Sequence, residues 1–186
     1  EGLIALMGGQ EKFIGRLDSL FVAKSKIEGP LVSSDISGLI GQYAHGNEPS
    51  HHIVHLYNYV NQSWKTQQLI DTILHTQYFN NPNGLSGNED CGQMSAWYVL
   101  NAMGFYQVCP GSPIYSVGRP IFDKVTINLP NGKVFEIIAN NNSRTNKYIQ
   151  SIRLDNILLE SPFFMHSDIM KGGKIVMEMG NTPVKQ

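Results

Sequence analysis

The most informative part of this chain is residues 87–98, Gly87-Asn88-Glu89-Asp90-Cys91-Gly92-Gln93-Met94-Ser95-Ala96-Trp97-Tyr98. A glycine-flanked turn that carries two carboxylates and an amide opens an apolar helix here. Carboxylates in such a turn suit acid–base chemistry or the binding of a hard cation. A structural interpretation is also open, in which Asp90 caps the helix and Gln93, three residues later, completes a capping box.

A second segment, residues 46–52, has the same pattern. Its sequence is Gly46-Asn47-Glu48-Pro49-Ser50-His51-His52. A glycine and an Asn–Glu pair are again followed by a helix start, which Pro49 indicates. Two such turns in one chain predict one shared site. The structural alternative is that Asn47 and Glu48 only cap the helix that Pro49 begins.

Residues 46–52 and 87–98 together closely resemble the signatures of glycoside hydrolase family 92, the calcium-dependent exo-acting α-mannosidases. The likeness runs from residues 3–9 to residues 166–173 and so covers nearly the whole chain. It implies inverting hydrolysis of terminal α-mannosides, with Ca²⁺ as cofactor and mannose-containing glycans, including N-glycans, as substrates. It also implies an extracytoplasmic location: periplasmic, cell-surface or secreted.

The resemblance assigns the catalytic carboxylates. Inverting hydrolysis needs a general acid and a general base roughly 6.5–9.5 Å apart. The family's base lies in the motif matched by residues 88–90, which gives this role to Asp90, with Glu89 as the second choice. Some members carry another acidic residue where this chain has Asn88.

The general acid of the family lies upstream of the position matched by Leu3 and has no counterpart here. The chain begins at Glu1 without an initiator Met, and we expect a fragment that needs the upstream remainder of its polypeptide. General acid–base catalysis contributes roughly 10²–10⁴-fold to a rate, so we expect the isolated chain to be essentially inactive.

The binding residues also follow from the resemblance. Asn47, Glu48 and Asn88 offer the oxygen ligands that Ca²⁺ prefers, and the ion binds sugar hydroxyls directly in the family. Of the crowded histidines, His45 and His51 are candidates for contacting the sugar.

Periodicity predicts helices in the first half of the chain and strands in the second. Apolar side chains recur at helical spacing in residues 10–21, 49–61, 63–78 and 94–105, and the middle two segments should form an antiparallel helical hairpin. Glycine, proline and serine indicate a loop over residues 24–37. Trp97 and Tyr98 are more typical of core than of a sugar-stacking surface.

Strand signals begin after residue 109. Alternating residues 124–129 and 134–139 flank a Pro-Asn-Gly turn and predict a β-hairpin. Further strand candidates are residues 152–154, 157–159 and 175–179, the first two joined by an Asp-Asn turn. The resemblance implies that residues 1–108 belong to an (α/α)6 barrel, which these few helices cannot close alone. Residues 109–186 then form an antiparallel, β-rich C-terminal segment.

Composition excludes several other classes of protein. The 186 residues are 41% hydrophobic and 16% charged, which suits a globular core, and a net charge of −1 gives no case for nucleic acid or an anionic membrane. No apolar run approaches the roughly 20 residues that span a bilayer. Cys91 and Cys109 are too few for a disulfide scaffold, and we expect both to be free.

Two competing functions remain. A zinc hydrolase could use His51 and His55, which are four residues apart, but His52 stands where the HExxH motif has glutamate. A non-catalytic carbohydrate-binding or structural module would keep the same fold without turnover. Substitution of Asp90 in an intact protein distinguishes the mannosidase from the binding module, because loss of the general base should abolish hydrolysis and leave folding intact. A zinc hydrolase predicts instead that zinc, and not calcium, restores chelated protein.

Overall fold

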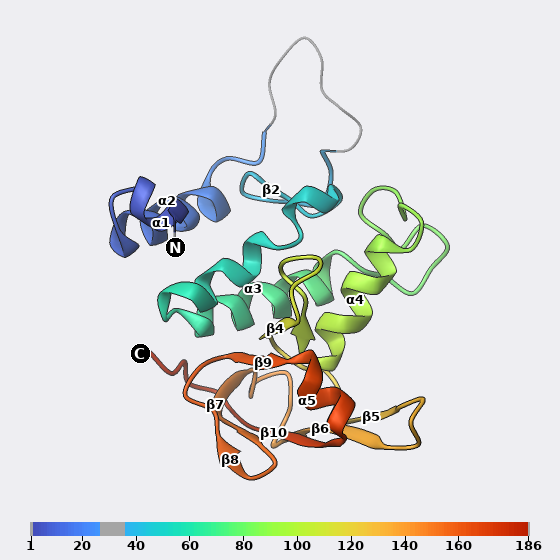
Figure 1. The fold of residues 1–186 in the computed structure, drawn as a ribbon. Helices are drawn as coiled ribbons and strands as arrows, with labels where there is room; N and C mark the ends of the chain where they lie inside the picture. The colour runs from blue at the N-terminus through green and yellow to red at the C-terminus, as the bar shows by residue number, and fades with distance from the viewer. Residues whose placement is uncertain (1, 27–35, 186) are drawn as a thin grey trace.

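The computed structural model describes residues 2–26 and 36–185 and divides them into a helical part and a strand-rich part (Figure 1). All helical elements except α5 (His166–Lys171) precede residue 104 in the described ranges, and most strands follow it, which confirms the predicted mixed fold class. The loop predicted for residues 24–37 lies largely outside the described residues. No helix in the described ranges has the length and apolarity needed to cross a membrane.

The helical segments follow the predicted periodicity closely at three of the four positions. Helices α2, α3 and α4 occupy Gln10–Val22, Ser63–Thr76 and Gln93–Met103, and α2 turns Phe13 and Leu17 into the core. The remaining helical elements are α1 (Gly2–Leu6), η1 (Glu48–Ser50), η2 (Ile53–Val60) and α5 (His166–Lys171).

The helix predicted over residues 49–61 is two short 3-10 segments, η1 and η2, instead of one helix. Side chains from elsewhere occupy carbonyl groups that an α-helix would use internally. The Trp97 indole N–H donates to the His51 carbonyl at 3.1 Å, and the Thr66 hydroxyl donates to the Val54 carbonyl at 2.9 Å. The backbone therefore keeps the tighter i to i+3 pattern. Asn61, at φ 55°, ends η2, and the chain turns back into α3, which packs against it.

The aromatic core of the helical part lies between η2, α3 and α4. Trp97, Tyr43 and Ile70 are fully buried there. Trp97 is therefore a core residue, as predicted. Tyr98, on the same helix, is partly exposed, so α4 is buried on one face only.

Three sheets make up the strand content of the described residues. A small hairpin joins β1 (Leu39–Ile40) to β2 (Tyr43–Ala44), and a three-stranded sheet has the order β3-β4-β9. The largest sheet has the order β5-β6-β10-β7-β8. The remaining strands are β3 (Phe105–Tyr106), β4 (Ile114–Val117), β5 (Lys124–Asn128), β6 (Val134–Asn140), β7 (Tyr148–Leu154), β8 (Ile157–Leu158), β9 (Phe163–Met165) and β10 (Gly173–Gly180).

The predicted hairpin forms, and the two strand candidates on either side of the predicted Asp155-Asn156 turn pair as a second hairpin. β5 pairs antiparallel with β6 across the Pro-Asn-Gly turn, and β7 pairs with β8. Asp155 and Asn156 have φ values of 46° and 72°, the two left-handed residues that a tight two-residue hairpin turn requires. One pairing departs from the antiparallel expectation, because β10 runs parallel to β6. β10 returns to the sheet through β9 and α5 and enters between β6 and β7.

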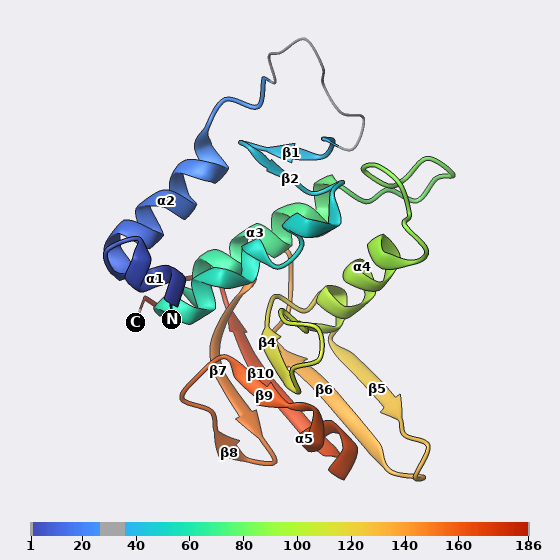
Figure 2. The same cartoon turned by 45° about the horizontal axis from the view of Figure 1, so that its top comes forward.

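The helical and strand-rich parts pack against each other. The boundary proposed at residue 108 falls between β3 and β4, which pair with each other. α3 lies against β7, and the Gln67 side-chain oxygen accepts the backbone N–H of Ile149 at 2.9 Å (Figure 2). Asp71 of α3 pairs at 3.0 Å with Arg119, which is only 2% exposed.

Candidate functional site

The two Gly-Asn-Glu turns meet in the structure at their glycines. A Cβ atom added to Gly87 would lie 2.8 Å from the Gly46 carbonyl oxygen, and one added to Gly46 would lie 2.4 Å from the Ser86 carbonyl oxygen. These separations leave no room for a side chain. The repeated pattern in the sequence therefore corresponds to one place in the fold, where Asn47 and Asn88 each follow a glycine at the contact.

The second turn has an unusual backbone before it enters α4. Asp90, Cys91 and Gly92 are all left-handed, with φ values of 53°, 56° and 98°. The N-cap of α4 is Gly92 and not Asp90, and a glycine has no side chain that could cap the helix. The capping box of Asp90 with Gln93 is therefore wrong. The exposed Asp90 carboxylate stands before the helix rather than on it.

Glu89 provides the capping that was expected of Asp90. Its two carboxylate oxygens accept the backbone N–H of Ser95 at 3.0 Å and the Ser95 hydroxyl at 2.8 Å. Ser95 is in the first turn of α4, where helix N–H groups lack internal partners. The sequence gives little sign of this contact, because the six-residue separation differs from the three-residue spacing of a capping box.

The first turn leads directly into η1. Asn47 occupies the N-cap position, but its side chain makes no capping hydrogen bond. The structure therefore does not show the capping role that was the alternative for this amide. Asn47 is half-buried and Glu48 is exposed. The negative charge of Glu48 acts on His51 and favours a higher imidazole pKa, although burial outweighs it.

His45 lies beneath the turns and is completely buried. Its Nδ1 is 2.9 Å from the Tyr43 hydroxyl and its Nε2 is 2.7 Å from the Tyr78 hydroxyl. Because the Tyr78 hydroxyl donates to the Met94 carbonyl at 3.2 Å, it must accept the His45 Nε2–H. Burial, assisted by the neighbouring His51, lowers the pKa of His45 from 6.5 to about 3 and keeps the ring neutral.

His51 links the first turn to α4. Its Nε2 lies 3.0 Å from the His45 carbonyl and therefore carries the proton, so Nδ1 accepts from the Gln93 amide at 3.2 Å. The same amide donates to the Tyr106 hydroxyl at 3.3 Å. Burial lowers the pKa of His51. Like His45, it is fully buried, and its ring contacts protein groups on both sides.

His55 belongs to a separate buried network. Its ring nitrogens contact the Ser116 hydroxyl at 3.1 Å and the Asn101 side-chain oxygen at 3.0 Å, and its ring stacks on Tyr106. Asn58 donates to the same Ser116 hydroxyl at 2.7 Å. Burial lowers the pKa of His55 to about 4. This network joins η2 and α4 to β4.

Three buried histidines are engaged with protein groups in the part of the chain that the structure describes. His45, His51 and His55 each direct both ring nitrogens at protein groups, and no cluster of three or more His, Cys, Asp or Glu suited to a metal occurs among the described residues. Both cysteines are free and exposed, as predicted. The structure thus offers no support for a zinc hydrolase.

The oxygen chemistry at the two turns is compatible with calcium. Asn47, Glu48 and Asn88 would offer two amides and one carboxylate, fewer than the six to eight oxygens that Ca²⁺ takes, so backbone, water or sugar oxygens would have to complete the set. The Ser37 hydroxyl is buried between the two glycines and has no hydrogen-bond partner in the described part of the chain. An unsatisfied oxygen at this junction fits a site that takes a polar ligand.

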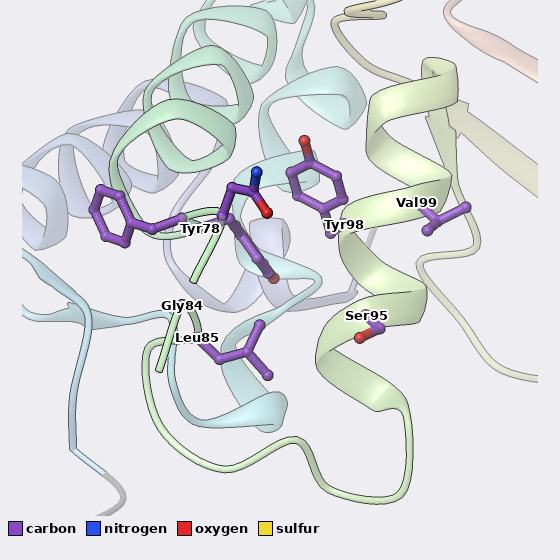
Figure 3. A pocket seen from close by; sticks show the side chains of 8 residues that line it. Tyr78, Gly84, Leu85, Ser95, Tyr98 and Val99 are labelled. Atoms are coloured by element: carbon purple, nitrogen blue, oxygen red, sulfur yellow. The ribbon is translucent and has the colours of Figure 1, made fainter. Parts of the chain in front are cut away.

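A pocket of about 340 Å³ lies beside the second turn. Tyr78 and Leu85 line it from the preceding loop, and Ser95, Tyr98 and Val99 line it from α4 (Figure 3). Its walls are mainly apolar, and Val99 is 52% exposed. The pocket borders the Glu89–Ser95 contact on the exposed face of α4.

Sequence reasoning did not identify several residues that shape this site. Three tyrosines hold the histidines, namely Tyr43, Tyr78 and Tyr106. The sequence suggests Gln93 as part of a helix cap, but its amide contacts His51 and Tyr106. Each works through a contact between distant segments. Their shared feature in the sequence is a polar atom on an otherwise apolar face, which signals a buried hydrogen bond but does not name its partner.

The chain is similar to known glycosidases over nearly all of its length. Residues 1–181 match the glycosyl hydrolase family 92 catalytic domain. An uncharacterized secreted glycosidase of Arthroderma benhamiae is 28% identical over 181 residues, which are 96% of this chain and 21% of that protein.

Solved structures share the fold at higher identity. A family 92 α-mannosidase of Bacteroides thetaiotaomicron gives a TM-score of 0.85 at 42% identity, over 95% of this chain and 23% of that one. An inverting family 92 mannosidase of strain VPI-5482 of that species gives a TM-score of 0.83 at 40% identity, over 98% and 26%. This chain spans 21–26% of the length of these relatives. With its match extending over residues 1–181, the chain belongs to glycosyl hydrolase family 92.

Proposed function

We propose that this chain supplies the base-bearing part of the active site of an inverting, calcium-dependent exo-α-mannosidase. The observation that carries the proposal is the contact of the two Gly-Asn-Glu turns at Gly46 and Gly87. Two segments with oxygen-rich side chains, 41 residues apart in sequence, meet at glycines that admit no side chain. The family supplies the reaction class, since two relatives of 40–42% identity are mannosidases.

In this proposal Asp90 is the general base. Its carboxylate removes a proton from the attacking water, while a general acid outside this chain protonates the departing oxygen. Asp90 suits this task because its side chain is exposed to solvent, where a water molecule can approach, and it lies two residues before the N-cap of α4.

Asn47, Glu48 and Asn88 would hold Ca²⁺. When bound, the ion orients the sugar hydroxyls and favours a distorted ring. The residues of this chain do the remaining positioning. Gly46 and Gly87 set the separation of the turns, and His51 ties the first turn to α4 through Gln93.

We propose a supporting role for His45 and His51 beneath the sugar site. Both rings are buried, and their nitrogens face protein groups. They act on the sugar through the shape of the turn that carries Asn47. A direct sugar contact by either ring would require that side chain to leave its present partners.

We further propose that the chain works within a longer polypeptide, in an extracytoplasmic compartment, on mannose-containing glycans. Its relatives are about four times as long, and one is described as a secreted glycosidase. Without the upstream acid the isolated chain should release no free mannose from α-mannosides. Turnover by the isolated, folded chain at the rate of the full-length protein would contradict this.

Asp90→Asn in the full-length protein tests the proposal. The amide cannot accept a proton, so we expect kcat on an α-mannoside to fall by roughly 10²–10⁴-fold. Wild-type product followed by ¹H NMR should appear first as β-mannose, the inverted anomer. Retained hydrolysis by the variant would exclude Asp90 as base, and glycan binding by a wild-type protein without hydrolysis would favour a binding module.

Metal dependence is tested in the same assay. A chelator should abolish hydrolysis by the wild-type protein, and Ca²⁺ should restore it, because oxygen ligands favour a hard cation. Restoration by Zn²⁺ instead would contradict the assignment of Asn47, Glu48 and Asn88.

A further inference from the structure

Glu89 has both carboxylate oxygens engaged by one residue. Oε1 accepts the Ser95 backbone N–H at 3.0 Å, and Oε2 accepts the Ser95 hydroxyl at 2.8 Å. A carboxylate with two hydrogen bonds to a single partner is held in position and orientation. This arrangement differs from that of a base that must approach a water molecule.

The backbone between Glu89 and α4 needs such support. Asp90 and Cys91 are left-handed at φ 53° and 56°, a conformation that L-residues adopt only where the surroundings hold it. The backbone bonds that close this loop are both long. The Gln93 N–H lies 3.2 Å from the Asp90 carbonyl, and the Met94 N–H lies 3.2 Å from the Glu89 carbonyl.

The Glu89–Ser95 bridge therefore spans the left-handed residues and fastens both of their ends. Residue 89 lies immediately before them, and Ser95 is in the first turn of α4. The Glu89–Ser95 pair is exposed to solvent. The negative charge of Glu89 also faces the N-terminus of α4, where free N–H groups favour an anion. Geometry and charge act in the same direction.

We propose that Glu89 is a positioning residue that holds Asp90 in place through Ser95, and that it does not itself transfer a proton. The inference deepens the proposed function, because it rests on Asp90 as the base. It replaces the second-choice assignment of Glu89 with a different role. It also explains why the turn carries two adjacent carboxylates: one fastens the loop and the other is presented by it.

Two substitutions at residue 89 separate positioning from chemistry. Glu89→Gln keeps both contacts, because its oxygen accepts the Ser95 N–H and its amide donates to the Ser95 hydroxyl, which can turn to accept. Glu89→Ala loses both. A misplacement of about 1 Å costs roughly 100-fold, so we expect kcat of the full-length Glu89→Ala variant to fall about 100-fold.

The expected pattern is specific to a positioning role. Glu89→Gln should stay within about 5-fold of wild-type kcat, because its replacement hydrogen bonds are similar in number to the originals. KM should change little in either variant, since two of the three proposed Ca²⁺ ligands, Asn47 and Glu48, lie on the other turn. Ser95→Ala, which removes only the hydroxyl contact, should fall between them. Glu160→Ala, which removes an exposed carboxylate elsewhere, should match the wild type.

Hydrogen exchange of the same full-length variants gives a readout that does not depend on turnover. Amides in residues 90–96 should exchange faster in Glu89→Ala than in Glu89→Gln or wild type, while the rest of the chain is unchanged. Equal loss of kcat in the Gln and Ala variants, or unchanged exchange in the Ala variant, would overturn the positioning role. If the full-length wild-type protein lacks mannosidase activity while Glu89→Ala still exchanges faster than Glu89→Gln and wild type, only the proposed function is refuted.

Discussion

At the scale of single residues, the site depends on glycine positions where the neighbouring backbone leaves no space for a side chain. Gly87 and Gly92 have the same φ of 98°, but only Gly87 faces another backbone segment. A Cβ on Gly87 would meet the Gly46 carbonyl, whereas a Cβ on Gly92 would have nothing within 4 Å. Substitutions at these two glycines therefore separate the energetic cost of a left-handed backbone from the cost of moving the two turns away from each other.

Gly87→Ala should therefore be much more damaging than Gly92→Ala. Both substitutions pay for a left-handed alanine, about 1–2 kcal/mol. Gly87→Ala also forces the turns apart and should lower the affinity for Ca²⁺, measured by isothermal titration of the full-length protein. Gly92→Ala should retain that affinity. Equal calcium affinities in the two variants would show that the turns do not share the ion.

At the scale of elements, local patterns predicted more than pairing partners. The apolar spacing of α2, α3 and α4 and the Asp155-Asn156 turn follow from neighbouring residues, and the structure confirms them. The 3-10 form of η2 and the parallel pairing of β10 with β6 depend on distant groups, namely Trp97 and a strand inserted late in the chain. Periodicity carries no information about either.

The candidate site shows the same division. The repeated Gly-Asn-Glu pattern indicated two related turns, and the structure brings them together. The contact of Glu89 with Ser95 was not predictable, because a left-handed loop shifts the helix start to Gly92. The capping pattern in the sequence presumed that Asp90 began the helix.

The buried histidine of η2 makes the stability of this region dependent on pH. His55 has a pKa of about 4 when folded, against an ordinary value near 6.5, so between these values the unfolded chain binds a proton that the folded chain does not. The contribution of the neutral His55 imidazole to the free energy of unfolding is fully present above about pH 6.5. It is lost on acidification, by up to about 1.4 kcal/mol per pH unit. His45, at about 3, acts in the same direction.

His55→Gln should reduce that slope. Denaturant midpoints of the full-length protein, measured between pH 7 and pH 4.5, should fall less steeply in the variant than in the wild type. The matched control is Tyr59→Phe, because Tyr59 lies exposed in the same 3-10 segment and a phenol does not change its charge in this pH range. An unaltered slope in His55→Gln would contradict the buried neutral imidazole.

At the scale of the whole molecule, one buried carboxylate joins the helical and strand-rich parts. Asp71 of α3 pairs with Arg119, and Lys147 and Arg144 approach the same carboxylate at 3.5 and 3.8 Å. The Asp71 and Arg119 side chains are 9% and 3% exposed. Removing one partner of such a buried pair leaves the other charge without compensation.

Asp71→Asn should therefore destabilise the protein by about 3–5 kcal/mol. Asp18→Asn is the control, since its partner Lys65 lies on a more exposed surface, with side chains 44% and 20% exposed, and exposed pairs contribute about 0–1 kcal/mol. Urea unfolding of the full-length variants measures both. Similar midpoints for the two variants would show that the Asp71 pair does not hold the parts together.

The position of β10 has a consequence for how the protein is made. β10 follows β6 and β7 in sequence but lies between them, so the five-stranded sheet has no continuous centre until residues 173–180 have been synthesised. Until then β6 and β7 each expose an unpaired edge, the kind of surface that templates association with other chains. A polypeptide truncated before residue 173 would therefore leave both edges unpaired, and we expect it to associate with other chains instead of completing the sheet.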